Sequence, residues 1–401
     1  GREDLLQRLD DHVGSDAPPP FVLFGEAGCG KSAILAQWSA LWREKHPEDL
    51  VIEHYIGSTP ESADWGGLVS RILGELKRAF GIADDLPVQP LVLQGALQEW
   101  LARAAGKRRI VVIMDALNQL ASGDPISRQL GWLPYALPVN VRMLLSTVPG
   151  DTLEAVRGRH WPGLELPLFH HADIPSACEA YLCTFGKKLP GDLVARLKKT
   201  HAACNPLYLR SVLDELRQIR GGECLVQAAD NYLAAADLTA LFDLIVARWD
   251  EDFGNLRESP GLVRRALSLI ACARFGLSEA ELLDLLGAGG NPLPRRYWSM
   301  IYLTAENALV QRSGLIAFGH EHLRSAVHRR WLEDAAVKRL FSLELAEYFN
   351  KIPEPTDRKL DELPALLRDS EEWESLLALL IYPPVFIRFR AKERRKWELH
   401  S

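Results

Sequence analysis

The sequence predicts a parallel α/β sheet domain followed by a largely helical region that contains one β-hairpin. Short apolar, β-branched runs alternate with amphipathic stretches up to residue 171, which is typical of a sheet with crossover helices. From residue 172, apolar residues recur at helical spacing almost throughout. Near the end of the helical region, two strand-like runs are joined by Ser313-Gly314, a pair that favours a tight turn.

Five apolar runs in the first part predict strands, and three amphipathic stretches between them predict helices. The predicted strands are residues 21–24, 51–56, 110–114, 143–146 and 164–168. We expect the helical stripes to be buried faces. They consist of Ile34, Trp38, Leu41 and Trp42, then Leu68, Ile72, Leu73, Leu76 and Phe80, and then Leu93, Leu97, Trp100, Leu101 and Ala104.

Two further stripes predict helices in the second part. They consist of Leu209, Val212, Leu213, Leu216 and Ile219, and of Leu241, Leu244, Ile245 and Trp249. Helices followed by a hairpin of residues 310–312 and 315–318 indicate a winged helix. The predicted organisation is an α/β domain over residues 1–171, a helical domain over 172–236, a winged-helix domain over 237–334 and a helical segment over 335–401.

The composition is that of a globular protein, with 47% hydrophobic and 25% charged residues in 401. The net charge of −6 gives no global attraction to nucleic acid or to an anionic membrane. The apolar runs are far shorter than the roughly 18 residues that span a bilayer, and the charged N-terminal segment has no signal-peptide pattern. We therefore expect a soluble protein without a membrane partner.

The six cysteines are scattered, and none forms a CxxC pair. No His cluster has the spacing of metal ligands, so the sequence predicts neither a disulfide framework nor a zinc site. Free thiols are typical of a reducing compartment, which favours a cytoplasmic location.

Residues 25–32 read GEAGCGKS, a complete GxxxxGK[ST] motif between the predicted strand 21–24 and a predicted helix. Glycines allow consecutive backbone N–H groups to surround an anion, and the helix N-terminus adds its positive dipole end. Lys31 would reach the β- and γ-phosphates of ATP, and the Ser32 hydroxyl would bind Mg²⁺. The predicted phosphate-binding set is Gly25, Glu26, Ala27, Gly28, Cys29, Gly30, Lys31, Ser32 and Ala33.

A second acidic element is expected to hold the Mg²⁺ from the end of a neighbouring strand. The run IVVIM leads into Asp115, as in a Walker B strand. The strand at 143–146 runs into Thr147, which could either sense the γ-phosphate or simply end a strand.

Together these segments resemble the STAND class of P-loop ATPases, and within it the NACHT-like modules of nephrocystin-3 and the telomerase-associated protein. The resemblance extends over nearly the whole chain. Its markers are GRED at residues 1–4, GEAGCGKS, MDALNQL, WLPYALP followed by LLST, CNPLYLRSVLDELR, FGLSEAELLDLLG and FGHEHLRSAV.

The resemblance implies a molecular switch that holds ADP as a closed monomer and exchanges it for ATP. The active form would oligomerise and activate an N-terminal effector, and a C-terminal sensor region would detect the trigger; both would lie outside this chain. Arg2 would lie near the adenine, Pro206 would pack against the base, and His320 would contact the β-phosphate of ADP. Alternatively, Arg2 is a solvated terminal residue, Pro206 only begins a helix, and His320 only caps a helix or packs in the core.

Two departures from the pattern of that class predict slow hydrolysis. Asn118 and Gln119 stand where many relatives carry an acidic residue, and an amide can orient water but accepts no proton. Val148 stands where an Arg is usual. The predicted catalytic set is therefore Lys31, Asp115, Asn118 and Gln119, in a slow ATPase.

Two other functions compete with the switch. A DNA-binding regulator that uses its winged helix would need a basic face, yet residues 261–335 contain nine Arg and no Lys against seven acidic residues. A conventional ATP-driven motor would need the acidic residue that is missing near Asp115. The basic tract 388–396 could bind an acidic partner or be a solvated helix face.

Overall fold

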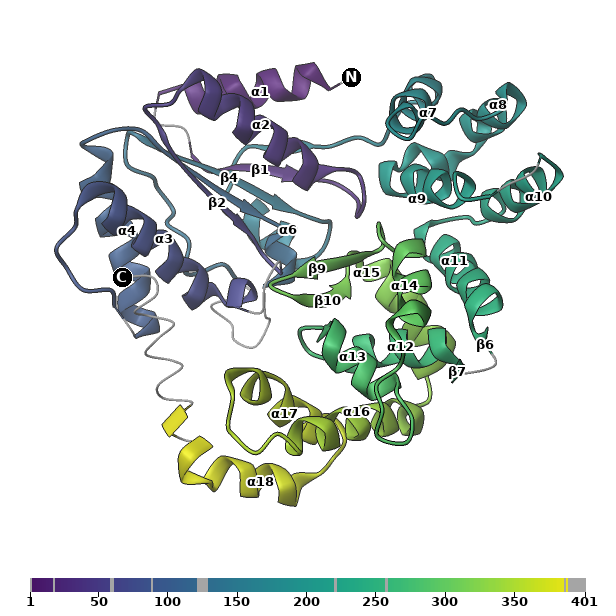
Figure 1. Ribbon diagram of the computed structural model, residues 1–401. Coiled ribbons are helices and arrows are strands. Elements are labelled where there is room, and N and C mark those ends of the chain that lie inside the picture. The colour runs from purple at the N-terminus through teal and green to yellow at the C-terminus, as the bar shows by residue number, and fades with distance from the viewer. Residues whose placement is uncertain are drawn as a thin grey trace. The chain divides into compact units, whose positions relative to one another are not determined.

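The computed structural model describes residues 2–16, 19–57, 61–87, 89–120, 129–219, 222–256, 259–385 and 387–388. These residues form two compact units. In the described part of the chain, the first unit consists of residues 2–169 and 205–207, and the second of residues 170–204 and 208–388. The first unit is built around a sheet, and the second is mostly helical (Figure 1).

The first unit contains a five-stranded parallel sheet of order β2-β3-β4-β1-β5. Its strands are β1 (Phe21–Phe24), β2 (Leu50–Tyr55), β3 (Ile110–Asp115), β4 (Val141–Thr147) and β5 (Gly163–Glu165). The first four predicted strands are confirmed to within two residues at either end. The fifth ends at Glu165, earlier than the predicted 164–168, because Pro167 has no N–H group to extend the ladder.

Helices cover both faces of this sheet, as Figure 1 shows. One face is covered by α1 (Glu3–Gly14) and α2 (Lys31–Lys45), which pack on alternate strand residues such as Leu23 and Ile113. The other face, which includes Val22 and Val112, is covered by α3 (Trp65–Phe80), α4 (Pro90–Ala105) and α6 (Asp151–Arg157). The predicted stripes of these helices are buried with the exception of Leu41, which is exposed and was wrongly assigned to the core.

The second unit begins with a group of helices and continues into helices combined with short strands. The first group consists of α7 (Ile174–Cys183), α8 (Gly191–Lys199), the short 3₁₀ helix η3 (His201–Cys204), α9 (Pro206–Leu216) and α10 (Gly222–Leu233). The first two residues of α9 belong to the first unit. Then follow α11 (Leu238–Phe253), β6 (Asn255–Leu256), β7 (Ser259–Pro260), α12 (Leu262–Cys272), β8 (Leu277–Ser278), α13 (Glu279–Leu286) and α14 (Arg295–Thr304). The chain continues with β9 (Leu309–Arg312), β10 (Leu315–Phe318), α15 (Glu321–Val327), α16 (Ala335–Asn350), α17 (Asp357–Asp369) and α18 (Trp373–Ile381).

The two stripes predicted for this unit lie on α9 and α11 and are buried except at two positions. Leu244 is exposed, so its assignment to the core is wrong, and Ile219 follows the end of α9 and is only half-buried. The apolar face of α11 is therefore narrower than its spacing predicts.

The predicted hairpin is confirmed. β9 and β10 pair antiparallel, with Leu315 opposite Arg312. Ser313 and Gly314 have φ angles of 49° and 81°, the two positive values that a tight type I′ turn requires. β8 joins the other edge of β10 to complete a three-stranded sheet. A hairpin surrounded by helices fits a winged helix, which stays a prediction.

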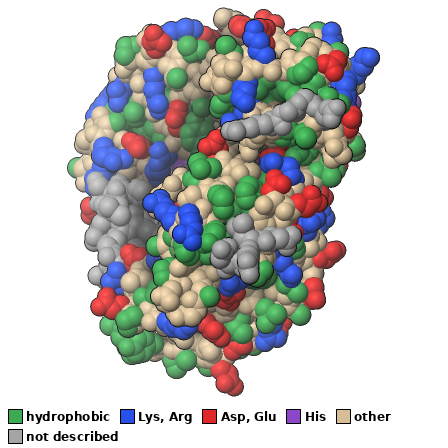
Figure 2. Space-filling model, turned by 45° about the vertical axis from the view of Figure 1, so that its right-hand side comes forward, with side chains coloured by type: hydrophobic (Ala, Val, Ile, Leu, Met, Phe, Trp, Pro, Cys, Tyr) green, Lys and Arg blue, Asp and Glu red, His purple; other side chains and the backbone are tan. Residues whose placement is uncertain are grey.

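Acidic and basic side chains are interspersed on the face shown in Figure 2. In the predicted winged-helix region, Arg295 pairs with Glu279 at 2.7 Å. Arg329 likewise pairs with Asp243 at 2.8 Å. Of the basic tract 388–396, Arg388 pairs with Asp357 at 3.1 Å, and residues 389–396 lie outside the described residues. Within the described ranges, no helix is both long and apolar enough to cross a bilayer.

Candidate nucleotide-binding site

Three predicted site elements lie at one edge of the parallel sheet. The GEAGCGKS loop follows β1 and leads directly into α2. Asp115 is the last residue of β3, and Thr147 is the last residue of β4, paired with Phe24 of β1. Because the carboxyl ends of parallel strands share an edge, the fold brings the loop, Asp115 and Thr147 to the same side of the sheet, where ligands of open α/β sheets bind.

The backbone of the loop requires glycine at its two ends. Gly25 has a φ of 155°, and a Cβ atom there would lie only 2.8 Å from the Leu166 carbonyl oxygen. Gly30 has a φ of 99°, and a Cβ atom there would lie 3.1 Å from a guanidinium nitrogen of Arg2. Both positions therefore combine a left-handed backbone with close neighbours, which only glycine tolerates.

Three consecutive carbonyl groups of the loop accept hydrogen bonds from residues far away in the sequence. The donors are a side-chain amide, a backbone N–H group and a guanidinium group. The three hydrogen bonds run from Asn205 Nδ2 to Ala27 O at 2.9 Å, from Leu207 N to Gly28 O at 3.2 Å, and from Arg2 Nη1 to Cys29 O at 2.8 Å.

These bonds orient the amides of the loop. In a planar trans peptide, the N–H group points away from the carbonyl of the preceding residue. The N–H groups of Gly28 and Gly30 therefore point away from the donors that hold Ala27 and Cys29. The Cys29 N–H group instead closes a turn on Glu26 O at 3.3 Å. The inner side of the loop thus presents backbone amides, the arrangement that binds anions.

Lys31 lies within the loop, where it is buried. Its ammonium group donates to Gly25 O at 2.7 Å and to Glu26 O at 2.8 Å, and it lies 3.6 Å from Cys29 Sγ. Cys29 itself is fully buried, as is common for free cysteines that pack like small apolar residues. The next residues, Ser32 and Ala33, are exposed in the first turn of α2.

Asp115 is buried and held by Ser146 of the adjacent strand β4. The Ser146 hydroxyl donates to Asp115 Oδ1 and accepts from the Ala116 N–H group at 2.8 Å. Thr147, the residue that the sequence singled out, donates instead to the Val148 carbonyl at 3.3 Å. The sequence marks Ser146-Thr147 as a polar strand end, but only Thr147 is predicted as a site residue. Neighbouring side chains on a strand point to opposite faces, so only one of the two can reach Asp115, and it is Ser146.

Asn118 and Gln119 lie in the short 3₁₀ helix η2 (Leu117–Gln119) that follows β3, and both are exposed. The side chain of Gln119 lies against Gly57, just after β2, because a Cβ atom at Gly57 would collide with Gln119 Oε1. Among the described residues 116–120, the segment after Asp115 therefore presents two amide side chains and no carboxylate.

Arg2 and Pro206 both lie at the outer side of the loop. Besides its bond to Cys29, the Arg2 guanidinium donates to the Pro167 carbonyl at 2.9 Å and lies 5.1 Å from the centre of the Phe169 ring. Pro206 is the first residue of α9, between the two residues that bond to the loop. Asn205 was missed, although it stands next to Pro206 in the CNPLYL segment. The predicted adenine contacts of Arg2 and Pro206 stay predictions.

His320 belongs to the second unit, where it precedes α15 and is half-buried. Its ring centre lies 6.2 Å from that of Phe242. Burial, together with the charges of Arg210, His322 and Arg312, lowers the pKa of His320 to about 4. The ring is therefore neutral at pH 7. Its predicted contact with the β-phosphate stays a prediction.

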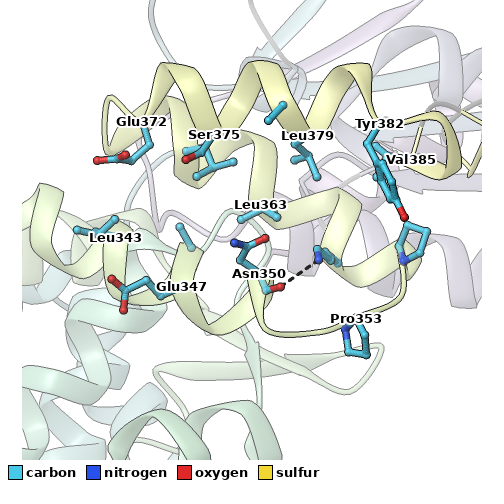
Figure 3. Close-up of a pocket in the computed structure, with 15 residues that line it drawn as sticks. Leu343, Glu347, Asn350, Pro353, Leu363, Glu372, Ser375, Leu379, Tyr382 and Val385 are labelled. Carbon is cyan, nitrogen blue, oxygen red and sulfur yellow. Dashed lines mark hydrogen bonds between the residues drawn. The ribbon is translucent and has the colours of Figure 1, made fainter.

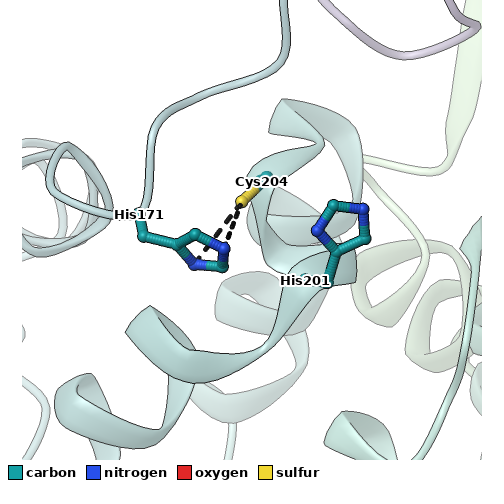
Figure 4. A group of neighbouring side chains, drawn as sticks. All are labelled: His171, His201 and Cys204. Carbon is teal, nitrogen blue, oxygen red and sulfur yellow. Dashed lines mark hydrogen bonds between the residues drawn. The ribbon is translucent and has the colours of Figure 1, made fainter.

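The second unit also brings together His171, His201 and Cys204, shown in Figure 4. The sequence predicts no zinc site, because no His cluster has the local spacing of metal ligands, and this stays a prediction. His171 lies thirty residues before His201 (201 − 171), so local spacing could not indicate that the fold brings the two together. Only the His-x-x-Cys pattern at 201–204 was a local signal.

A cavity of about 550 Å³ lies among α16, α17 and α18 in the second unit (Figure 3). Its walls include Leu363 and Leu379, with Glu347 at one side. The cation in its wall, Lys359, donates to the backbone carbonyls of Asn350 and Ile352 at 3.2 and 2.7 Å. The cavity contains none of the predicted phosphate-binding residues.

The chain matches no family model. It is 26% identical over 399 residues to a tetratricopeptide-repeat-containing protein of Dictyostelium discoideum, which covers 89% of this chain and 24% of that protein. It is also 26% identical to mouse nephrocystin-3 over 95% of this chain and 29% of that protein. The chain therefore spans about a quarter of the length of these curated relatives.

Solved structures that the chain is similar to include a Walker-type ATPase of Pyrococcus abyssi, with 14% identity, a TM-score of 0.42, and 82% and 95% of the two chains covered. Another is the Aeropyrum pernix ORC1 protein in complex with DNA, with 18% identity, a TM-score of 0.38, and 84% and 94% covered.

Proposed function

We propose that the first unit binds ATP and ADP together with Mg²⁺ at the carboxyl edge of its sheet. The observation that supports this most directly is the GEAGCGKS loop, whose carbonyls are held from outside so that its amides face inward. The loop leads into the N-terminus of α2, which adds the positive end of a helix dipole.

The side chains at this edge fit a magnesium–phosphate group. Lys31 carries the positive charge that would bind the β- and γ-phosphates once it leaves the carbonyls of Gly25 and Glu26. Mg²⁺ prefers oxygen ligands, and the Ser32 hydroxyl and the Asp115 carboxylate would supply them. Bound Mg²⁺ would neutralise charge on the phosphates. The hydrogen bond from the Ser146 hydroxyl would fix the orientation of the Asp115 carboxylate as a ligand.

Hydrolysis at this site is proposed to be slow. The residues after Asp115 that could face an attacking water are Asn118 and Gln119, and their amides orient water without taking its proton. Val148 adds no cation for the γ-phosphate. The proposed activity is therefore that of a slow ATPase.

The wider role that we propose is a nucleotide-controlled switch of the STAND kind, in the cytoplasm. The ordered set of motifs supports it, as does the similarity to nephrocystin-3 over most of the chain. In this proposal ADP favours a closed monomer, ATP favours a homo-oligomer, and the partners are an effector and a sensor region. Pairing of Arg295 and Arg329 with carboxylates supports the view that nucleic acid is not a partner.

The nucleotide proposal is tested by calorimetry with ADP and with Mg²⁺-ATP. Lys31→Ala should abolish binding, because it removes the charge within the loop. Lys45→Ala is the matched control, since it removes a lysine that lies at the other end of α2 and pairs with Asp10. Ser32→Ala should weaken binding only when Mg²⁺ is present. Equal affinities of wild type and folded Lys31→Ala, checked by circular dichroism, would overturn the proposal.

A further inference from the structure

Three side chains with metal-binding atoms converge in the second unit. His201 and Cys204 are the first and last residues of η3, and a 3₁₀ helix of three residues per turn places positions i and i+3 on the same side. His171 approaches them from the turn before α7. The ligand atoms of the three residues all lie within 4.8 Å of one another, and Figure 4 shows the His171 ring beside Cys204, with His201 on the same short helix as Cys204.

The distances are close to those of a tetrahedral site. With metal–sulfur bonds of about 2.3 Å and metal–nitrogen bonds of about 2.0–2.1 Å, neighbouring ligand atoms lie about 3.3–3.6 Å apart. Cys204 Sγ lies 3.7 Å from His171 Nε2. All three ligand atoms lie within 4.8 Å of one another, and both histidines are exposed, so their rings have room to rotate toward one ion.

His171 is already held in the form that a metal needs. Its Nδ1 lies 2.6 Å from the Lys198 carbonyl oxygen, which can only accept a hydrogen bond. Nδ1 therefore carries the proton, and in the neutral ring Nε2 has the free lone pair. Cys204 Sγ lies 3.7 Å from both ring nitrogens, so the ring must turn for this lone pair to point toward a shared ion. A histidine that donates its other N–H group to a backbone carbonyl is the usual arrangement around a bound metal ion.

We propose that His171 Nε2, His201 and Cys204 Sγ bind one Zn²⁺ ion, with a solvent molecule as the fourth ligand. Imidazole and thiolate are the ligands that zinc prefers, whereas Mg²⁺ prefers oxygen. Binding converts the Cys204 thiol to a thiolate, and the displaced proton goes to solvent. This zinc site is separate from the proposed Mg²⁺ site, and its test is independent of nucleotide binding.

Cys204 anchors the site from the protein interior, since it is 4% exposed, whereas the two histidines reach it from the surface.

The test uses the whole chain, stripped of metal with a chelator and titrated with Co²⁺ in the presence of excess Mg²⁺ and without nucleotide. One equivalent of Co²⁺ should produce a thiolate-to-cobalt charge-transfer band, and Zn²⁺ should remove it. Cys204→Ser should abolish the band. His171→Ala and His201→Ala should each weaken Co²⁺ binding by at least about tenfold.

Matched controls separate this site from adventitious binding. His170→Ala removes an exposed histidine next to His171, and Cys183→Ser removes an exposed cysteine of α7. Both should bind Co²⁺ as wild type does. A wild-type chain without the band would overturn the proposal, and so would a band that persists in Cys204→Ser. If Cys204→Ser fails to fold, His201→Ala decides the matter: unchanged Co²⁺ affinity in that variant overturns the proposal.

Discussion

Acid should destabilise the second unit through His320, and replacing it with glutamine should remove this effect. Burial lowers the pKa of His320 from 6.5 to about 4, and the charges of Arg210, Arg312 and His322 act in the same direction. The unfolded chain therefore takes up a proton at a higher pH than the folded chain does. The contribution of neutral His320 to the free energy of unfolding is fully present above pH 6.5 and decreases as the pH falls. Below about pH 4 both the folded and the unfolded forms are protonated, and this contribution no longer changes.

The size of the effect follows from the two pKa values. A pH of 5.0 lies about 1.5 units below the pKa of 6.5 of the unfolded imidazole, which is therefore mostly protonated. The folded imidazole, with its pKa of about 4, is still mostly neutral at this pH. At about 1.36 kcal/mol per unit, the loss is about 2 kcal/mol relative to pH 7.5. This is a sizeable part of a typical stability of about 5–15 kcal/mol.

Urea unfolding at pH 7.5 and 5.0, followed by tryptophan fluorescence, measures this loss. Wild type should lose about 2 kcal/mol more than His320→Gln between the two pH values, because other titrating groups cancel in the comparison. His328→Gln, which replaces an exposed histidine nearby, should behave as wild type. Proton NMR should show that the signal missing from His320→Gln titrates near pH 4. Equal losses in the two proteins, or a midpoint near 6.5, would refute the reasoning.

Three further predictions concern the nucleotide site. Ser146→Ala should reduce the Mg²⁺-dependent part of nucleotide affinity by about tenfold, because a hydrogen bond to a carboxylate is worth about 1.5–3 kcal/mol; unchanged calorimetry would contradict this. Arg2→Ala should weaken ADP and ATP binding by about tenfold, since it releases the Cys29 carbonyl; titration with a fluorescent nucleotide measures it. ATP turnover should be well below about 1 per second, and no lower in Asn118→Asp; a phosphate-release rate of tens per second would favour the motor.

Much of the first unit could be predicted from sequence because its signals are local. The buried strand that ends in Asp115 is apolar on both faces, which gives a continuous run. Gly25 and Gly30 of the loop lie at positions with a positive φ angle, which glycine adopts without strain. In contrast, Leu41 and Leu244 share the spacing of core residues but are exposed, because spacing reports only the side of the helix and not how far the neighbouring elements extend.

The contacts that shape the sites could not be predicted from sequence, because they join distant segments. Asn205 bonds to the loop across 178 positions, and no pattern around residue 205 indicates that partner. Ser146 and Thr147 are equally plausible at the end of a strand, and only the register with β3 decides which reaches Asp115. His171 reaches Cys204 because the chain folds back through α7 and α8, which no local spacing records.

The hydrogen bonds at the outer side of the loop define what the proposed switch requires of the first unit. Asn205 and Leu207 hold the carbonyls of Ala27 and Gly28, and all four residues belong to that unit. A ligand shifts a conformational equilibrium only as far as it binds one state better than the other. The proposed switch therefore requires that ADP and ATP bind the loop with different geometries. The hydrogen bonds to Asn205 and Leu207 are where such a difference is expected to be measurable within this unit.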